Sequence, residues 1–499
     1  MKDKRFIEES FPVKEVSEIS AKEKNIRHGH ISTLHIWWAR RPLASSRATN
    51  YAALISAPKD EVDWDKKRQF IIKLSKWENS LNHHMIEKAK KDILNANGGR
   101  PLRILDPFAG GGSIPLEALR LGCETHAVEY NPVAVLILKC TLEYPQKYGE
   151  KVKKKVRDNF GMETEIEVNP LLEDVKKWGN FVLEEAKKEI GRFYPNDEDS
   201  SISVGYIWAR TIPCQNPACG AEIPLMRQFW LARKSNKKIS LYPYVDGKEV
   251  RFKIAGNGYE KIPAGFDPSK GTVSRAIATC PVCGYTVDDK TTRKLFQEGE
   301  ARERMVAVVL HKPGTEGKRY RLATEKDMKV FREAEEYMEE KRKRLMDEWG
   351  IDPMPDEPLR RVPVTFGVIN VWVYGMNTWG DLFNSRQKLA LITFVEKVRL
   401  SYQKMIEKGY DEEYAKAVVS YLNLALGRLA DYSTTLTVWE NNRDTIADTF
   451  SRQALPMIWD YIEANAIGSS SGNWLSGINW ILNVLSHLSQ IPPVRMEEE

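Results

Sequence analysis

The spacing of apolar residues divides the first third of the chain into helical and extended stretches. Between Lys66 and Asn97, apolar residues recur at helical spacing among many lysines, which predicts an amphipathic helical region with a solvated outer face. The apolar run 103–105 then ends in a glycine turn, and apolar residues at helical spacing follow it to residue 121. A second short extended run covers residues 125–128. The pattern therefore predicts strand, glycine turn, helix and strand in succession.

The later two thirds alternate between similar patterns. Residues 146–200 are charged and predict mainly helix, and residues 239–254 predict a β hairpin that turns at Asp246-Gly247. From residue 296 to 350 the pattern predicts a return to helix, with a capping box at 324–327 that begins a long helix through Trp349. Two further helices are expected near 385–408 and 412–430.

The composition is that of a soluble globular protein with more than one domain. The 499 residues are 42% hydrophobic and 29% charged, and the net charge of +6 permits nucleic-acid binding without requiring it. No apolar run approaches the ~18 residues of a membrane span, and the first residues lack the apolar core of a signal peptide. We therefore expect a cytoplasmic protein without a membrane partner.

The glycine turn has the residue types of a cofactor site. Asp106-Pro-Phe-Ala leads into three glycines, whose backbone can approach a ligand closely, and Glu129 ends the second strand about 20 residues later. A carboxylate at this place accepts hydrogen bonds from ribose hydroxyls. The dinucleotide pattern G-x-G-x-x-G is absent, so a pyrophosphate is not the favoured ligand. The alternative is a glycine-rich turn in some other α/β domain.

An aromatic and basic cluster precedes this motif. Trp37 and Trp38 stand beside Arg40 and Arg41, a combination that suits stacking on a base or adenine ring together with contacts to phosphate or carboxylate. A packed N-terminal helix whose arginines pair with acidic neighbours explains the same residues equally well.

Four of the six cysteines form two close pairs. Cys214 and Cys219 form a C-x4-C pair, Cys280 and Cys283 form a C-x2-C pair, and each pair is followed by glycine, as in zinc knuckles. Four thiolates make a closed tetrahedral site, so we expect one structural Zn²⁺. About sixty residues separate the pairs, which indicates an inserted β-rich lobe. Cys123 and Cys140 are single and are expected to be buried structural thiols.

The last third mixes aromatic and polar residues in a way typical of surfaces that contact DNA. Such residues occur in two runs, 372–387 and 432–453, and can stack on flipped bases and hold phosphates. Because the chain has 14 tryptophans, any individual one is expected to serve packing. The basic run 341–344 either contacts phosphates or forms a solvated face balanced by nearby glutamates.

Several of these segments together resemble adenine-specific DNA methylases that contain a zinc ribbon. The resemblance rests on the Asp106–Gly112 loop, Glu129, both cysteine pairs and the segments 35–42 and 380–387. It implies transfer of a methyl group from S-adenosylmethionine to the exocyclic amino group of adenine in DNA, in restriction-modification or antiviral (phage) defence. The resemblance and the loop chemistry together give a set of expected cofactor residues, which are Asp106, Phe108, Ala109, Gly110, Gly112, Glu129 and Tyr130.

One motif of the resembled enzymes is missing. Amino-methyltransferases present the target base with Asp/Asn/Ser-Pro-Pro-Tyr/Phe/Trp, and the one Pro-Pro here, at 492–493, lacks both flanking residues. No catalytic residue can therefore be assigned, and the 499 residues are expected to be an N-terminal portion or one member of a split pair. Two alternatives stay open: an RNA guanine amino-methyltransferase, and a catalytically silent DNA-binding subunit of a defence complex.

The expected fold is α/β, with a Rossmann-like methyltransferase sheet that is incomplete, an inserted zinc-ribbon β lobe and a mainly helical C-terminal region. Five segments follow: an N-terminal helical segment that is a candidate cofactor or DNA lid, the S-adenosylmethionine-binding part, the zinc ribbon with its β insertion, a charged helix and linker, and an aromatic-rich region for target recognition. Their boundaries are 1–100, 101–205, 206–295, 296–360 and 361–499.

Overall fold

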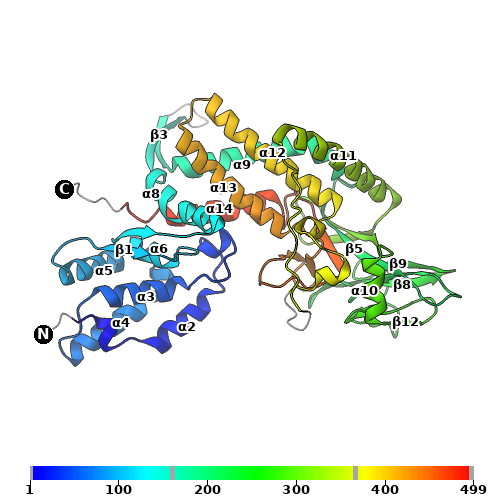
Figure 1. The fold of residues 1–499 in the computed structure, drawn as a ribbon, viewed down its shortest axis with the longest axis horizontal. Coiled ribbons are helices and arrows are strands. Elements are labelled where there is room, and N and C mark those ends of the chain that lie inside the picture. Colours follow the sequence, from blue (N-terminus) through cyan, green and yellow to red (C-terminus); the bar gives the residue numbers. More distant parts are fainter. Residues whose placement is uncertain (1–3, 158–162, 364–368, 494–499) are drawn as a thin grey trace. The chain divides into compact units, whose positions relative to one another are not determined.

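The computed structural model describes residues 4–157, 163–363 and 369–493. The chain forms two compact units (Figure 1). Unit 1 comprises Met1–Trp178, Tyr402–Leu424 and Ile478–Glu499, and unit 2 comprises Gly179–Ser401 and Ala425–Gly477. Each unit combines helices and strands, so the fold class is mixed α/β, as expected. No helix among the described residues is long and apolar enough to cross a membrane.

Unit 1 begins with helices packed around one apolar core. Tyr51, Ile71, Leu74 and Ile93 are among the residues buried there. The lysine-rich region expected to be helical forms two helices, because Asn82 caps the second by accepting a hydrogen bond from the Met85 backbone N–H. The helices of this part are α1 (Phe6–Glu9), α2 (Val13–Glu23), α3 (Leu43–Leu54), α4 (Glu61–Ser75) and α5 (His83–Ala96).

The predicted succession of strand, turn, helix and strand follows these helices. Strands β1 (Arg103–Asp106) and β2 (Glu124–Ala127) pair in parallel, with α6 (Ser113–Arg120) between them in the chain. Among the described residues neither strand has a second partner, so the expected Rossmann-like sheet is not confirmed. The chain continues through α7 (Pro132–Leu138), a π-helical turn over Lys139–Glu143, and α8 (Tyr144–Tyr148).

The segment 146–200, expected to be mainly helical, begins with strands instead. Strands β3 (Val152–Arg157) and β4 (Glu163–Val168) form an antiparallel pair before α9 (Pro170–Ile190). On β4, Thr164, Ile166 and Val168 alternate with glutamates, and this period of two favours a strand over a helix. The expectation of helix was therefore correct only for α9.

The central sheet of unit 2 is antiparallel and curls. Its strand order is β14-β13-β5-β17, with β6 paired to β5, and two register shifts between β13 and β5 add to its twist (Figure 1). These strands are β5 (Ile202–Pro213), β6 (Glu222–Leu225), β13 (Arg302–His311), β14 (Arg319–Leu322) and β17 (Asp460–Ala464).

Smaller sheets and a helix complete the strand-rich part of unit 2. The hairpin of β8 (Lys238–Asp246) and β9 (Glu249–Gly256) turns at Gly247, which has a φ of 62°, as the sequence predicted. The other elements are β7 (Trp230–Arg233), β10 (Val273–Ser274), β11 (Ile277–Thr279), β12 (Thr286–Val287), α10 (Asp289–Gln297), β15 (Val438–Glu440) and β16 (Thr445–Ala447).

The expected return to helix from residue 296 was wrong at its start. Residues 302–311 form β13, which lies between β5 and β14 in the sheet and carries the buried run 305–310. Beyond them the prediction is confirmed, because Thr324 and Asp327 form a capping box that begins α11 (Glu325–Trp349). The two later helices are also confirmed as α12 (Ser385–Glu407) and α13 (Glu412–Asp431), and α14 (Trp474–Leu488) follows β17.

The basic run 341–344 forms a solvated face only in part, because Lys343 and Arg344 are exposed whereas Lys341 is buried. Lys341 is fully buried, and its ammonium contacts the carboxylates of Glu189 and Glu396, at 2.6 Å in the latter case. Arg344 donates to the same Glu396 at 2.8 Å. Lys341 is therefore balanced by glutamates distant in the sequence, whereas Arg342 and Arg344 also pair with Asp352 and Glu348 nearby.

Candidate cofactor site and metal centre

The glycine loop is held in place by backbone hydrogen bonds from both strands of unit 1. The Val128 N–H donates to the Asp106 carbonyl at 2.9 Å, and the Ala109 N–H donates to the Val128 carbonyl at 3.1 Å. Gly110 and Gly112 have φ angles of 50° and 77°, which disfavour other residues. The loop therefore runs across the carboxyl ends of β1 and β2, where α/β sheets bind their ligands.

The side chain of Glu129 is hydrogen-bonded to this loop. Its carboxylate accepts hydrogen bonds from the backbone N–H groups of Gly110 at 2.8 Å, Tyr130 at 2.8 Å and Asn131 at 3.1 Å. The three N–H groups hold the pKa of the Glu129 carboxyl below its ordinary value. An ionised carboxylate has about four acceptor sites, so this one keeps capacity for a further donor.

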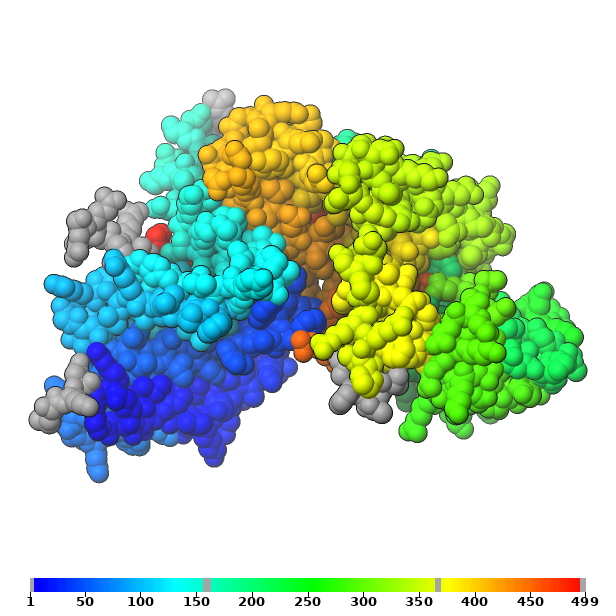
Figure 2. All heavy atoms as spheres, viewed as in Figure 1, coloured from blue at the N-terminus to red at the C-terminus, as the bar shows by residue number. Residues whose placement is uncertain are grey.

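The N-terminal cluster of Trp37 and Arg40 lies directly on the glycine loop. The N-terminal helices, including α3, pack against α6 and form a continuous surface with residues 101–120 (Figure 2). A Cβ atom at Gly110 would lie 2.9 Å from Trp37 Nε1, and one at Gly111 would lie 3.0 Å from Arg40 Nε. The Ser113 hydroxyl also donates to the Arg41 carbonyl at 2.7 Å. These contacts place Trp37, Arg40 and Arg41 beside the glycine loop.

This packing also gives the glycines a reason that involves no ligand. Trp37 and Arg40 leave no room for side chains at the first two glycines, and at Gly112 a Cβ would lie 2.9 Å from Leu138 Cδ2. The glycine run by itself therefore does not identify a cofactor. The case for a cofactor site therefore depends on the charges and the exposed rings around the loop.

Arg40 is a cation without a carboxylate partner among the described residues. Its Nη2 donates to the His35 carbonyl at 3.0 Å, whereas its Nε is buried and forms no hydrogen bond there. Burial lowers the pKa of the Arg40 guanidinium to about 10, so the group remains charged at neutral pH. A buried charge is costly unless an anion or hydrogen bonds satisfy it.

Two aromatic rings project from the same loop into solvent. Phe108 is 90% exposed and Tyr130 is 100% exposed, although large apolar side chains are usually covered. Leu105 and Val128, on or next to the strands, are 63% and 54% exposed. This part of unit 1 thus presents an apolar surface beside Glu129.

A pocket of about 590 Å³ opens next to this surface, between β2 and α7. Its volume lies in the range of small-molecule sites, and its lining combines apolar side chains with a few charged ones. The lining residues are Leu119, Glu124, Thr125, Ala127, Val128, Glu129, Val135, Leu138, Lys139, Leu142, Glu143 and Gln146. Of the seven expected cofactor residues, Glu129 alone lines this pocket, and the other six lie on the loop and the turn beside it.

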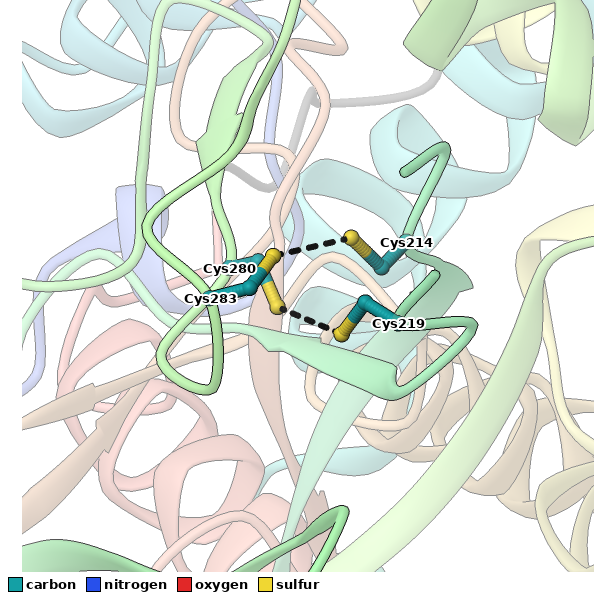
Figure 3. Close-up of side chains that lie close together, drawn as sticks. All are labelled: Cys214, Cys219, Cys280 and Cys283. Carbon is teal, nitrogen blue, oxygen red and sulfur yellow. Dashed lines mark hydrogen bonds between the residues drawn. The ribbon is translucent and has the colours of Figure 1, made fainter. Parts of the chain in front are cut away.

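The four paired cysteines meet in unit 2, with their sulfurs directed at one another (Figure 3). All four Sγ atoms lie within 4.8 Å of one another, Cys214 and Cys283 are 3.6 Å apart, and Cys219 and Cys280 are 3.9 Å apart. A tetrahedral zinc with Zn–S bonds of ~2.3 Å separates its sulfurs by about 3.8 Å, so these distances fit a metal and are far too long for a disulfide.

Two similar turns present these thiols. Cys214 follows β5 and Cys219 precedes β6, and the Gly220 N–H donates to the Asn216 carbonyl within this turn. In the second turn the Gly284 N–H donates to the Cys280 carbonyl at 2.9 Å. The backbone N–H of Tyr285 lowers the pKa of Cys283 to about 7. The group can hold a metal ion, and it would join the β5–β6 corner to the small sheet β10–β12.

The two single cysteines behave as expected. Cys123 and Cys140 are buried in unit 1, and burial raises the pKa of Cys123 to about 11 and that of Cys140 further. Neither lies near another cysteine at disulfide distance. Both are structural thiols.

The aromatic and polar residues of the last third are largely interior. Arg386 is 1% exposed and forms an ion pair with the fully buried Glu463, and Gln387 donates to the Thr434 carbonyl at 3.0 Å. Trp439 is likewise buried and donates to the Leu231 carbonyl. These residues hold the core of unit 2 together, whereas Trp379, Arg443 and residues 451–453 remain at the surface.

Sequence reasoning missed a buried charge network behind the loop. Glu117 on α6 accepts from Arg47 Nε at 2.5 Å and from Arg120 Nε at 3.2 Å, and all three side chains are at most 2% exposed. Arg47 also donates to the carbonyls of Leu74 and Lys76. The one signal in the sequence is an acidic residue on an otherwise apolar helix face.

Comparison with known proteins gives one match. Residues 10–77 match a family described as "Protein of unknown function (DUF1156)". No curated protein and no solved structure matches the chain. The matched segment covers α2 to α4 and includes Trp37 and Arg40, which lie on the glycine loop.

Proposed function

We propose that this chain binds S-adenosylmethionine at the glycine loop and serves transfer of its methyl group to the exocyclic amino group of adenine in DNA. The observation that carries the proposal is the Glu129 carboxylate, which is bound to the glycine loop through Gly110 and also forms part of the pocket wall. Its remaining acceptor capacity suits the ribose hydroxyls of the cofactor.

Two further features support this ligand. The exposed rings of Phe108 and Tyr130 offer an apolar surface for the adenine ring of the cofactor. The guanidinium of Arg40, which has no carboxylate partner among the described residues, suits the carboxylate of its methionine part, since planar guanidinium groups bind carboxylates well. The cofactor supplies an activated methyl group, and the residues of this chain bind and orient it.

The proposal includes a completing segment. Parallel sheets are normally covered on both faces, yet β1 and β2 have no further partner among the described residues and leave Leu105 and Val128 exposed. We propose that a segment or partner chain with the Asp-Pro-Pro-Tyr motif adds to this sheet and presents the adenine. A restriction-modification or antiviral defence setting follows from the resemblance alone.

For the cysteine cluster we propose one structural Zn²⁺ bound by Cys214, Cys219, Cys280 and Cys283. The sulfur distances match tetrahedral coordination, and four protein ligands leave no position for a reactive water. The metal thus stabilises the fold of unit 2 and takes no part in methyl transfer.

Calorimetric titration with S-adenosylmethionine tests the cofactor site. We expect the Glu129→Ala variant to lose about tenfold or more in affinity, because hydrogen bonds to a charged group contribute about 1.5–3 kcal/mol. Asp65→Ala, which removes an exposed carboxylate elsewhere in unit 1, is the matched control and should bind as the wild type does.

Absence of binding by the wild-type chain, even after a segment with Asp-Pro-Pro-Tyr is supplied, would sink the proposal. A catalytically silent DNA-binding subunit is the second candidate, favoured by the uncovered pair of strands. It predicts DNA binding without cofactor binding or methyl transfer in the completed complex.

A further inference from the structure

Three lysines and a serine-rich loop of unit 2 come together around one carboxylate. Lys234 Nζ lies 2.8 Å from Asp444 Oδ2, and Lys237 Nζ lies 3.4 Å from the same oxygen. Lys237 Nζ also donates to the Lys318 carbonyl at 2.6 Å, and Lys318 Nζ donates to the Ser470 hydroxyl. We call this group the lysine–serine site. It draws on the loops β7–β8 and β13–β14, the turn β15–β16 and the loop before α14.

The charges of the lysine–serine site do not balance. Asp444 is buried, and its second oxygen accepts a hydrogen bond from the Tyr320 hydroxyl at 3.1 Å, so the carboxylate is fixed between its neighbours. Lys318 has no carboxylate within ion-pair distance among the described residues. Burial lowers the pKa of Lys318, Asp444 acts against this shift, and the positive charges of Lys237 and Lys234 lower the pKa further. Three ammonium groups thus face one carboxylate, which leaves positive charge for an anion to offset.

Unused hydrogen-bond donors lie beside these charges. Within the part of the chain that the structure describes, the backbone N–H groups of Ser469, Ser470 and Ser471 donate to no acceptor. The Ser471 hydroxyl is enclosed and also lacks a partner there. The helix start itself is already satisfied, because Asn473 Oδ1 accepts from the Ser476 N–H at 2.9 Å. The free donors therefore belong to the serine loop and not to the end of α14.

We propose that the lysine–serine site binds a phosphate group of a DNA backbone. Ammonium groups, hydroxyls and backbone N–H groups are the donors that proteins use for phosphate oxygens. Two exposed arginines extend the positive surface. Arg233 on β7 has no carboxylate partner among the described residues, and Arg443 in the β15–β16 turn is 73% exposed although it lies 3.5 Å from Glu440. A run of cations of this kind suits a chain of phosphates. The identity of the polyanion as DNA rests on the proposed function, whereas the phosphate site does not.

Binding of a short fluorescent DNA duplex at a series of salt concentrations tests this assignment. Because each phosphate contact releases counterions, we expect the double variant Lys234→Gln/Lys318→Gln to reduce the slope of log K against log salt by about two. The matched control is Lys261→Gln/Lys329→Gln, which removes two exposed lysines of unit 2 that form no ion pair. It should leave the slope unchanged. Equal slopes for the two double variants would overturn the assignment of the site to DNA.

Inorganic pyrophosphate separates a phosphate site from a DNA site. At constant ionic strength it should raise the melting temperature of the wild type and of the control, but not of Lys234→Gln/Lys318→Gln. A second variant, Ser470→Ala, keeps all charges and should weaken this protection in part, which guards against a folding defect of the lysine variant. Protection by pyrophosphate without any change in the DNA slope would overturn the assignment to DNA.

Cofactor titration of the same variants keeps the two proposals distinguishable. The lysine–serine site belongs to unit 2 and Glu129 to unit 1, so the lysine variants should bind S-adenosylmethionine with wild-type affinity. The lysine variant could reduce the salt slope of DNA binding although the wild-type chain never binds S-adenosylmethionine. That result would refute the proposed function and still support the phosphate site.

Discussion

The four-cysteine cluster and the glycine loop differ in how much of each site the described residues supply. The cysteine cluster has all its ligands, and its sulfurs lie within 4.8 Å of one another. At the glycine loop, Phe108 and Tyr130 project into solvent and the sheet beneath has two strands. A site that two short turns build can be complete by itself, whereas a site at the end of a parallel sheet depends on neighbouring strands.

The cysteine cluster and the glycine loop also differ in how deeply their residues are buried. Cys214, Cys219 and Cys280 belong to an apolar core of unit 2 that the turns themselves help to form. The strand residues Leu105 and Val128 belong to no such core and remain exposed. Substitutions in each region can therefore test whether the cysteine cluster is complete and the glycine loop is not.

Removal of the metal should have the largest effect. We expect about one zinc per chain by elemental analysis, and we expect Cys283→Ser or chelation to leave the zinc-ribbon part of unit 2 insoluble or sensitive to protease. The physical reason is that binding of a structural zinc supplies about 10–16 kcal/mol of apparent free energy to folding. Cys123→Ser, which changes a buried thiol of unit 1, is the control and should keep the zinc.

A well-folded preparation without zinc would contradict the metal site. It would also weaken the comparison itself, because the cysteine cluster would then be no more complete than the glycine loop.

The next largest effect is expected behind the glycine loop, at the ion pair of Arg47 and Glu117. Glu117→Gln leaves two buried guanidinium groups without their counter-charge and should lower the free energy of unfolding by about 3–5 kcal/mol. Glu87→Gln removes a half-exposed pair with Lys90 and should cost less than about 1 kcal/mol. Urea unfolding followed by circular dichroism measures both.

This ion pair also predicts a pH dependence. Burial raises the pKa of Glu117, but the charges of Arg120 and Arg47 outweigh burial and hold it below the ordinary value of 4.5. A carboxyl whose pKa is lowered by folding stabilises the protein above its ordinary pKa and loses that contribution as the pH falls. The difference in stability between wild type and Glu117→Gln should therefore be full near neutral pH and shrink in acid below 4.5. A constant difference across this range would show that the charge of Glu117 does not matter.

Features fixed by neighbouring residues were predictable from the sequence. The capping box of Thr324 and Asp327, the turn at Gly247 and both cysteine turns depend on a few adjacent positions, and the structure confirms each of them. The strand–glycine–helix–strand succession around Asp106 is of the same kind.

Features that depend on distant residues were not predictable. The buried apolar run of β13 looks the same in a helix and in an inner strand, because all of its faces are covered. The counter-charges of Lys341 lie at Glu189 and Glu396, far away in the sequence. Likewise, nothing near Gly111 indicates that Arg40 packs on it.

The smallest effect on stability is expected for the exposed apolar side chains beside the glycine loop. Leu105→Ser and Val128→Ser should change the free energy of unfolding by less than about 0.5 kcal/mol, since both side chains are already exposed. Leu116→Ala on α6, which is fully buried, is the matched control and should cost about 2–5 kcal/mol. When the proposed completing segment is present, the two serine variants should weaken its association with this chain. If Leu105→Ser instead destabilises the chain alone as much as Leu116→Ala does, then Leu105 is covered from within, and the glycine-loop site is as self-contained as the cysteine cluster.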